Sequence, residues 1–255
     1  MRVLLHRQNF DFLQKRQRLT AKKNFITLNC KLKTNKRFTI FMNQQKLRRT
    51  VFVALFAAII CVACVLAIPL PGGVPISLQN FFCILAGALL GSFRGVAAVL
   101  VWILLGAVGV PVFANAHGGL GVLLGPTGGY IVGYALGALF VGLLLGSPKI
   151  DEKSKGIKRW ILIFFACFFG YVLVYVPGIP RFMAVMAANG KPQTFQNALS
   201  LTFIPFIPGD LIKFFITVSL GIALRPVVAR YFFNDDDEKS ALEELNRLNE
   251  NSKNE

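Results

Sequence analysis

The residues best suited to bind a small polar molecule are an aspartate and a lysine, Asp210 and Lys213, within the apolar block PFIPGDLIK. A spacing of three places both side chains on one face of a helix, and Pro208 and Gly209 mark where that helix begins. Charged groups at membrane depth either pair with each other or line a cavity. We therefore interpret the two residues as a clamp in which Asp210 accepts N–H hydrogen bonds and Lys213 donates to a carbonyl or carboxylate. A self-neutralising ion pair is the alternative.

A glycine-rich segment, GGLGVLLGPTGGY at Gly118–Tyr130, lies between two long apolar segments and is interpreted as a loop. Together with the block PFIPGDLIK it is expected to form the site. Glycines permit tight turns and close approach of the backbone to a ligand. Thr127 is expected to cap the following helix, whose first amides belong to Gly128, Gly129 and Tyr130. Because a helix N-terminus favours an anion, these amides could receive a ligand carboxylate.

Three amide side chains are secondary candidates for lining the site. Gln79 and Asn80 enter the second apolar segment, where buried amides need hydrogen-bond partners. Asn115 stands at the mouth of the glycine-rich loop. The neighbouring His117 is expected to be solvated rather than functional.

The elements that must position these groups are long apolar segments. They lie at Val51–Ile68, Ile76–Leu90, Val96–Phe113, Gly129–Leu145, Trp160–Val176 and Leu211–Leu224. A membrane-spanning helix needs about 20 apolar residues. The pattern predicts an all-α integral membrane protein, a bundle of six transmembrane helices, of which the second and sixth apolar runs are the short ones.

The charge of the chain divides it into three parts. The net charge is +16 over 255 residues, but residues 1–50 hold 14 Lys and Arg and a single acid, Asp11. We expect residues 1–41 to be a basic extension, with Met42 as the native start, and 42–232 to be the membrane domain. Residues 233–255 form an acidic tail that is expected to be disordered outside a short helix at Ala241–Leu248. Nucleic-acid binding is not expected.

Basic residues beside the apolar segments predict the orientation. They lie before the first segment, at Arg94, in the linker Ser147–Arg159 and after the sixth segment, all on one side if there are six spans. By the positive-inside rule both termini are cytoplasmic. The GPTGGY loop and the start of the PGDLIK helix then share the outer face and can meet.

Small residues recur at helical spacing. Gly129, Gly133 and Gly137 repeat every four residues, which favours close helix packing within one chain. Ala54 and Ala58 form a similar pair in the first segment and could instead be a docking surface for another membrane subunit.

Enzymatic motifs are missing from the sequence. It contains no GxxxxGK[ST], HExxH or GxSxG, so it predicts a binder without catalysis, cofactor or metal. Cys61 and Cys64 form a CxxC inside an apolar run, and with no second Cys pair or nearby His they are interpreted as packing residues.

In collinear order, VPISLQNFFCILAGALLGSFRG, LLGAVGVPVFA, GGLGVLLGPTGGYIVGY and FIPGDLIK resemble the BioY family, from about Ala54 to Leu224. Its members are biotin-specific substrate-capture (S) components of energy-coupling factor (ECF) transporters. Where many relatives read VFAGG, this chain reads VFANAHGG, which includes Asn115.

The resemblance implies a six-helix bundle with biotin near the outer surface, under the loop between spans three and four. It implies that Asp210 and Lys213 contact the ureido ring, and it places the valerate carboxylate at the helix start Thr127–Tyr130. It also implies that Ala54 and Ala58 contact a transmembrane coupling protein, which binds two ATPase subunits that alone use ATP.

The sequence therefore predicts a biotin-capturing subunit of an ATP-driven importer in a bacterial cell membrane. Three alternatives remain at this point. The nearest is the same architecture with another small vitamin-like ligand, the second is a membrane assembly protein without a ligand, and the last is an intramembrane enzyme.

Overall fold

The computed structural model describes residues 47–68, 74–148, 156–232 and Arg247. The compact unit considered below is Arg48–Phe233. The predicted extension 1–41 lies outside the described residues, as does the predicted tail helix Ala241–Leu248 apart from Arg247.

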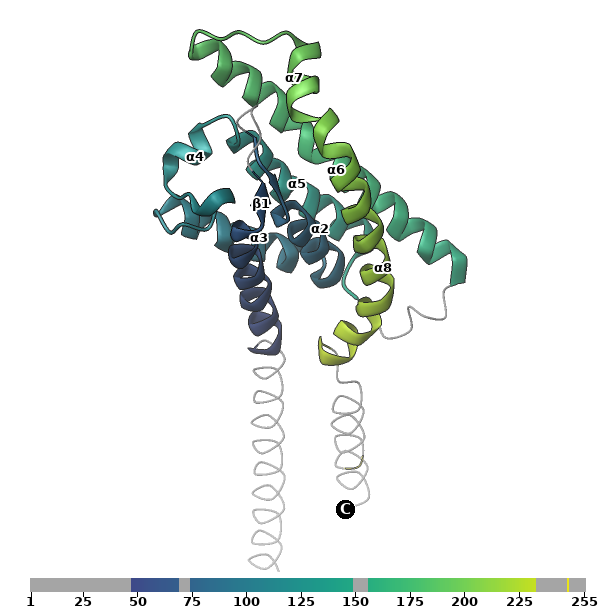
Figure 1. The fold of residues 1–255 in the computed structure, drawn as a ribbon. Helices are drawn as coiled ribbons and strands as arrows, with labels where there is room; N and C mark the ends of the chain where they lie inside the picture. The colour runs from purple at the N-terminus through teal and green to yellow at the C-terminus, as the bar shows by residue number, and fades with distance from the viewer. Residues whose placement is uncertain (1–46, 69–73, 149–155, 233–246, 248–255) are drawn as a thin grey trace, which may run out of the picture. The chain divides into compact units, whose positions relative to one another are not determined.

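The described elements are almost all helices (Figure 1). In chain order they are the helix Leu47–Val65, whose last turn is η1 (Ala63–Val65), β1 (Ala67–Ile68), β2 (Ile76–Ser77), α2 (Gln79–Leu90), α3 (Ser92–Ala107), η2 (Ala114–Ala116), α4 (Leu120–Leu124), α5 (Gly128–Leu145), α6 (Gly156–Ala188), α7 (Phe195–Thr202), η4 (Ile204–Phe206) and α8 (Ile207–Phe232). The two short strands pair antiparallel, with Ala67 opposite Ser77.

Helices of membrane-spanning length confirm the predicted class of protein. Four helical segments of the described chain are long and apolar enough to cross a bilayer: Leu47–Val65, α5, α6 and the continuous stretch Phe195–Tyr231. The helices α2 and α3 are equally apolar but have only 12 and 16 residues. At about 1.5 Å per residue, α2 covers roughly 18 Å of a hydrocarbon core about 30 Å thick.

The helix α5 packs against α2, α3 and α6, and glycines allow these close contacts. A Cβ added at Gly133 would collide with the backbone of Val174 in α6, and one at Gly87 of α2 would collide with Ala138 of α5. Because the nearest atoms all belong to the backbone, the clash could be relieved only if the helices moved apart. The glycine spacing therefore serves packing within the chain, as predicted.

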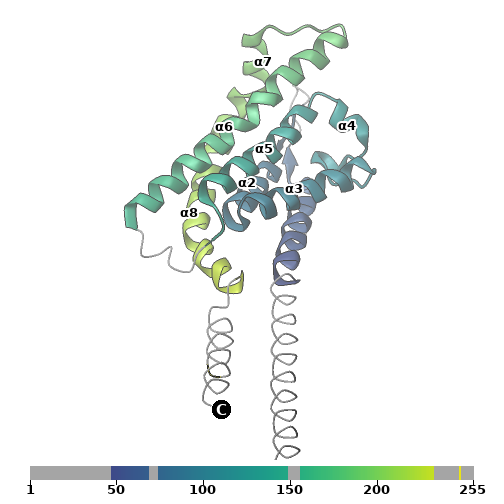
Figure 2. The ribbon, with the colours of Figure 1, turned by 180° about the vertical axis from the view of Figure 1, so that it is seen from behind.

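One end of the unit is tied together by Arg225, a fully buried residue of α8. Its guanidinium donates to the carbonyl of Ala88 near the end of α2, and to Leu145 and Gly146 at the end of α5, both at 3.1 Å. Arg159, in the first turn of α6, also donates to Leu145 at 2.9 Å. The ends of α2, α5 and α8 thus lie together with the start of α6 (Figures 1 and 2).

The opposite end carries α4 and α7 (Figure 1). Here the prediction of loops is wrong in two places. Residues 120–124 of the glycine-rich segment form the helix α4, and the fifth span does not end at Val176 but continues to Ala188 through Pro177 and Pro180. In a membrane helix the carbonyls released by proline can find other partners, so proline need not end it.

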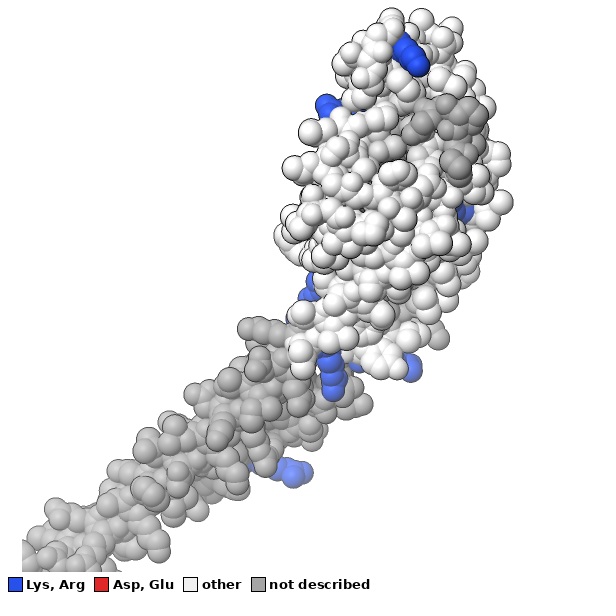
Figure 3. Space-filling model, turned by 60° about the vertical axis from the view of Figure 1, so that its left-hand side comes forward, with Lys and Arg blue, Asp and Glu red and all other residues white. Residues whose placement is uncertain are grey.

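Charge is scarce on the described part of the chain. Asp210 is its single acidic residue. Figure 3 shows one face on which Lys and Arg lie mainly toward the ends of the described part, with a broad surface between them that carries almost no charge. Such a surface suits contact with lipid. Ala54 and Ala58 are both exposed on the first helix.

Candidate binding site

Asp210 and Lys213 lie in the first two turns of α8, which begins at Ile207, as the Pro-Gly signal predicts. Lys213 Nζ is 3.1 Å from Asp210 Oδ1. The two side chains are only 13% and 10% exposed, so this ion pair lies largely out of water. The spacing of three residues therefore does bring the two charges into contact.

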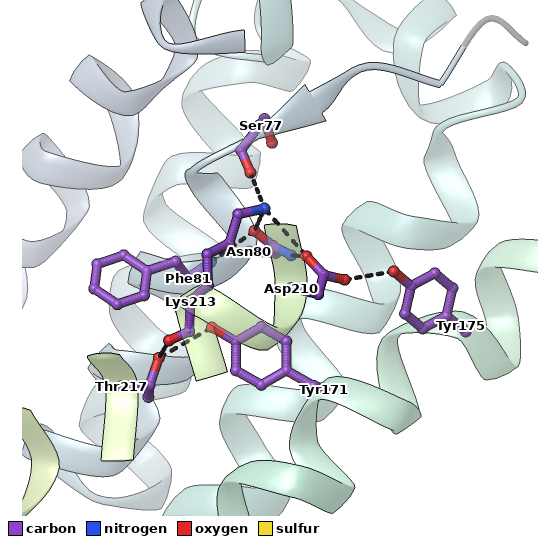
Figure 4. Close-up of polar contacts among 8 residues, drawn as sticks. All are labelled: Ser77, Asn80, Phe81, Tyr171, Tyr175, Asp210, Lys213 and Thr217. Atoms are coloured by element: carbon purple, nitrogen blue, oxygen red, sulfur yellow. Dashed lines mark hydrogen bonds and ion pairs between the residues drawn. The ribbon is translucent and has the colours of Figure 1, made fainter. Parts of the chain in front are cut away.

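All three donors of the Lys213 ammonium are engaged (Figure 4). Besides Asp210 they meet the backbone carbonyl of Ser77 at 2.8 Å and Oδ1 of Asn80 at 3.1 Å. Ser77 ends β2, and Asn80 lies in the first turn of α2. The start of α2 and the start of α8 are thereby joined through one buried charge.

Asn80 binds both members of the ion pair. Its Nδ2 donates to Asp210 Oδ1 at 3.0 Å, while its Oδ1 accepts from Lys213 and from the backbone N–H of Phe81 at 2.9 Å. Every polar atom of this amide therefore has a partner, which meets the requirement for a buried amide in a site of low dielectric constant. The sequence predicted Asn80 as a secondary candidate, and the structure brings it into direct contact with Asp210 and Lys213.

Sequence reasoning missed Tyr175 of α6, which belongs to the cluster, and its neighbour Tyr171, which makes no hydrogen bond to either charged side chain. Tyr175 donates its hydroxyl to Asp210 Oδ2 at 2.5 Å. Tyr171, one turn earlier, shares a hydrogen bond of 3.0 Å with Thr217, which in turn donates to the Lys213 carbonyl. Two tyrosines four positions apart lie on one face of an apolar helix, and a buried tyrosine hydroxyl needs a hydrogen-bond partner. This spacing could have indicated a polar contact on that face of α6.

Next to this cluster lies a cavity of about 250 Å³. Its wall comprises Val74, Pro75, Ser77, Gln79, Phe113, Ala114, Asn115, His117, Gly121, Val122, Gly125, Pro126, Thr127, Tyr130, Ile131 and Tyr134. Pockets for drug-sized ligands hold about 300–1,000 Å³, so this cavity, just below that range, suits a molecule at the small end of that class. Asp210 and Lys213 are not in the wall, but Ser77, whose carbonyl Lys213 holds, is.

Gln79 presents an oriented amide to the cavity. Its Nε2 donates to the carbonyl of Val112 at 2.6 Å, an acceptor that Trp102 Nε1 also uses at 2.8 Å. A carbonyl only accepts hydrogen bonds, so the Gln79 amide must turn its Nε2 toward Val112. The side-chain oxygen of Gln79 then points away from Val112. In the part of the chain that the structure describes, no donor contacts that oxygen. Gln79 therefore offers an acceptor in the cavity wall.

Asn115 and His117 reach the cavity from a strained turn. Asn115 and Ala116 have left-handed backbone conformations, with φ of 59° and 56°. The turn is closed by the backbone N–H of Phe113, which donates to the His117 carbonyl at 2.9 Å, and by His117 Nδ1, 3.1 Å from the Ala114 carbonyl. His117, expected only to be solvated, is exposed and also belongs to the wall.

The start of α5 differs from the predicted anion site. Thr127 occupies the N-cap position, but its hydroxyl donates backwards to the Val122 carbonyl at 3.4 Å and caps no amide of α5. The amides of Gly128 and Tyr130 already donate to Gly125 and Thr127. The prediction that Thr127 caps the helix is therefore wrong, because the turn before α5 uses these groups itself.

Of the three residues predicted at this helix start, only Tyr130 belongs to the wall. A Cβ at Gly128 would strike the Leu123 carbonyl, and one at Gly129 would strike the Pro177 carbonyl. Both glycines thus permit packing of α5 against α4 and α6. The Tyr130 ring lies against Gly178 of α6, where a Cβ would meet it at 2.5 Å.

The roof of the cavity is formed in part by α4 and its flanks. Arg181 of α6 donates to the Leu124 carbonyl at the end of α4, at 2.5 Å. A ligand enclosed here would meet acceptors and hydroxyls but no lysine, arginine or carboxylate in the wall itself. Among the described residues no cluster of His, Cys, Asp or Glu could hold a metal ion, and the described cysteines are free thiols.

This arrangement can bind a small polar molecule through oriented hydrogen bonds. No described side chain pairs a nucleophile with a general base at the cavity. The hydrogen-bonding groups in the wall suit recognition of a ligand.

Comparison with known proteins gives consistent results. The sequence profile of the BioY family matches residues 34–230. The biotin transporter BioY of Rhodobacter capsulatus is 38% identical over 188 residues, covering 72% of this chain and 94% of the relative. The biotin transporter BioY of Thermotoga maritima is 37% identical over 179 residues, covering 70% and 96%.

A solved structure is also similar. It is the crystal structure of the S component for biotin from an ECF-type ABC transporter, with a TM-score of 0.60 and 30% sequence identity. The match covers 72% of this chain and 93% of that one.

Proposed function

We propose, on the premise that this chain belongs to the BioY family, that it is the biotin-binding substrate-capture subunit of an ATP-driven vitamin importer. It takes up biotin from the outer face and delivers it to the cytoplasm together with a coupling module. It is a transport protein and not an enzyme. The observation that carries the ligand assignment is the buried cluster of Asp210, Lys213 and Asn80 beside a cavity of about 250 Å³.

The ureido ring of biotin has two N–H donors and one carbonyl, which matches this cluster. Asp210 and the Gln79 side-chain oxygen are the acceptors for the N–H groups. Lys213 is the donor for the carbonyl, and because its three donors are occupied, the ligand must replace one present acceptor. Of the three residues that accept from Lys213, Ser77 belongs to the cavity wall, so its carbonyl is the acceptor that we propose the ligand replaces.

The remaining predicted site residues surround the rest of the ligand. Tyr130 contributes an aromatic wall, Asn115 a polar contact at the mouth, and Gly128 and Gly129 the close packing that places Tyr130. We propose no cofactor and no metal. ATP is used only by partner subunits.

We further propose that α2 and α3 also cross the membrane, which gives a bundle of six transmembrane helices in a bacterial cell membrane. Arg159 and Arg230 lie in elements whose ends meet at the end of the unit that Arg225 holds together. Arg48 lies in the first turn of the first helix, whose Phe52 packs against Tyr231 near the end of α8. The positive-inside rule assigns this end to the cytoplasm. Both termini are then cytoplasmic, and the cavity lies toward the outer face. The exposed Ala54 and Ala58 are the proposed contact with a transmembrane coupling protein, which carries two ATPase subunits.

Equilibrium binding of radiolabelled biotin to the detergent-purified full chain tests this function. We expect saturable binding that becomes about 10- to 100-fold weaker in Asp210→Asn, because hydrogen bonds to a charged group are worth about 1.5–3 kcal/mol. Lys213→Ala should lose affinity comparably. Lys191→Ala, at an exposed lysine, is the control and should bind like the wild type.

The outcomes separate the alternatives. Wild-type protein that is well folded but does not bind biotin removes the proposed ligand. Binding that Asp210→Asn and Lys213→Ala both leave intact would move the site away from this cluster and favour a different small ligand there.

A further inference from the structure

We infer that Tyr175 is a positioning residue for ligand binding, whose hydroxyl holds the Asp210 carboxylate so that one acceptor site on Oδ2 is directed to the ligand. The inference deepens the proposed function and rests on it, since it assumes that Asp210 accepts an N–H of the ligand. Neither the sequence pattern nor the similarity to biotin transporters assigns a role to this tyrosine.

The first argument is a count of acceptor sites on Asp210. A carboxylate offers about four lone-pair sites, two on each oxygen. Oδ1 already accepts from Asn80 at 3.0 Å and from Lys213 at 3.1 Å. Oδ2 accepts from the Tyr175 hydroxyl at 2.5 Å, and within the described chain it has no second donor. A ligand N–H therefore binds Oδ2, the oxygen that Tyr175 holds.

The second argument is that Tyr175 is itself fixed and touches the cavity wall. Its ring packs edge-on against Tyr130, a wall residue, at 6.0 Å between centroids, and against Phe203 at 4.9 Å. These contacts from α5 and from the start of η4 determine where the hydroxyl points. Figure 4 shows Tyr175 approaching Asp210 from the side opposite to Lys213.

The third argument concerns the carboxylate without this hydroxyl. Asp210 is 13% exposed, and its other donors, Asn80 and Lys213, both lie at Oδ1. With no donor on Oδ2, the carboxylate can turn about its terminal bond and share both oxygens with Lys213 and Asn80. The acceptor site for the ligand is then lost without loss of the ion pair, so the fold survives while binding weakens.

The chain supplies a matched control in Tyr171. It lies one helical turn earlier in α6, it is buried, and its hydroxyl makes a hydrogen bond of 3.0 Å to Thr217 rather than to Asp210. Tyr171→Phe thus removes one engaged tyrosine hydroxyl from the same helix without touching the carboxylate.

The experiment measures the dissociation constant of radiolabelled biotin for the full chain in detergent, for wild type, Tyr175→Phe, Tyr171→Phe, Asp210→Asn and the double variant Tyr175→Phe/Asp210→Asn. We expect Tyr175→Phe to bind about tenfold more weakly, the loss of roughly one hydrogen bond to a charged group, and Tyr171→Phe to stay within about twofold of wild type. Adding Tyr175→Phe to Asp210→Asn should change little, because the carboxylate it orients is gone. A purely structural tyrosine would weaken binding in both backgrounds.

Equal affinities for Tyr175→Phe and Tyr171→Phe, with wild type binding normally, would overturn this inference and leave the proposed function standing. So would an undiminished effect of Tyr175→Phe in the Asp210→Asn background. If the double variant binds too weakly to measure, the comparison of the two single tyrosine variants decides. Absence of biotin binding by the wild type would remove the proposed function and this inference together.

Discussion

At the scale of single residues, the donors of the Lys213 ammonium are all engaged within the protein. Lys213 uses its three donors on Ser77, Asn80 and Asp210. A buried charge left without partners costs several kcal/mol, so these bonds stabilise the buried ammonium. Ligand binding must therefore be an exchange of partners rather than the filling of vacant donors, and its net free energy is smaller than the sum of the new contacts.

The sequence predicts the charged pair and Asn80, but not the partners that complete the cluster. Asp210 and Lys213 stand out because charges in apolar helices are rare. The Ser77 acceptor is a backbone carbonyl, which any residue type supplies, and Tyr175 lies 35 positions before Asp210 in an otherwise aromatic helix. Such contacts depend on how α6 packs beside α8, which no local spacing encodes.

The strained turn beside the cavity provides a prediction at this scale. Ala116 has φ 56°, a left-handed conformation that costs a residue with a Cβ about 1–2 kcal/mol. We expect Ala116→Gly to stabilise the protein by about 0.5–1 kcal/mol, since part of the gain is lost to the greater freedom of glycine in the unfolded chain. Thermal unfolding of the purified protein in one detergent should show a higher midpoint.

Ala184→Gly is the control for this substitution. It makes the same change at an exposed position inside α6, where glycine should destabilise by about 1 kcal/mol. A decrease in midpoint for both variants would show that the left-handed turn stores no strain.

At the scale of elements, glycine decides how closely the helices pack. The stripe Gly129, Gly133 and Gly137 on α5 faces α6, where the nearest atoms to an added Cβ include the backbone carbonyls of Pro177, Val174 and Gly170. In lipid the hydrophobic effect does not favour one helix pairing over another, so such close packing carries much of the specificity. A wider α5–α6 spacing would also move Tyr130 away from Tyr175.

Gly133→Ala should therefore lower the free energy of unfolding by about 1–3 kcal/mol, the usual cost of overpacking. The matched substitution is Gly209→Ala, in the first turn of α8, where an added Cβ meets no atom within 4 Å. It should leave the unfolding midpoint unchanged or raise it. Equal losses of stability in the two variants would argue against steric separation of α5 and α6.

The helices were predictable where composition alone determines them. The first, second and fourth segments match helices of the structure within four residues at each end, since a long apolar run in a membrane protein forms a helix to satisfy its own backbone. The sixth, predicted at Leu211–Leu224, is longer in the structure, at Ile207–Phe232. The errors lie at the end that carries α4 and α7. Proline and glycine predicted loops at 118–130 and beyond 176. In the structure α4 is a short helix that contacts α5, and the end of α6 stays helical where it contacts α5 and α7.

At the scale of the whole molecule, the chain combines the proposed ligand site at one end with an opposite end that carries basic residues and is held together by Arg225. Arg225 holds α2, α5 and α8 at the end away from α4 and α7. A bundle joined in this way can present its site as a rigid body. Movement of the ligand across the membrane would then depend on reorientation of the whole bundle by a partner.

The last prediction concerns that partner. If Ala54 and Ala58 form the docking surface, large side chains there should block assembly and leave the ligand site intact, because both residues are exposed on the first helix. Ala54→Leu/Ala58→Leu should bind biotin like the wild type in detergent. In proteoliposomes containing a coupling protein and its ATPases, it should fail to support ATP-dependent uptake of radiolabelled biotin.

The matched control is Ala184→Leu, which makes the same enlargement at an exposed alanine of α6, and it should retain both binding and uptake. Wild type without the coupling module should bind biotin but accumulate almost none, because a bundle that only captures its ligand has no source of energy for uptake. Normal uptake by the Ala54→Leu/Ala58→Leu variant would move the docking surface to another face of the bundle. Concentrative uptake by the protein alone would show that reorientation does not need a partner.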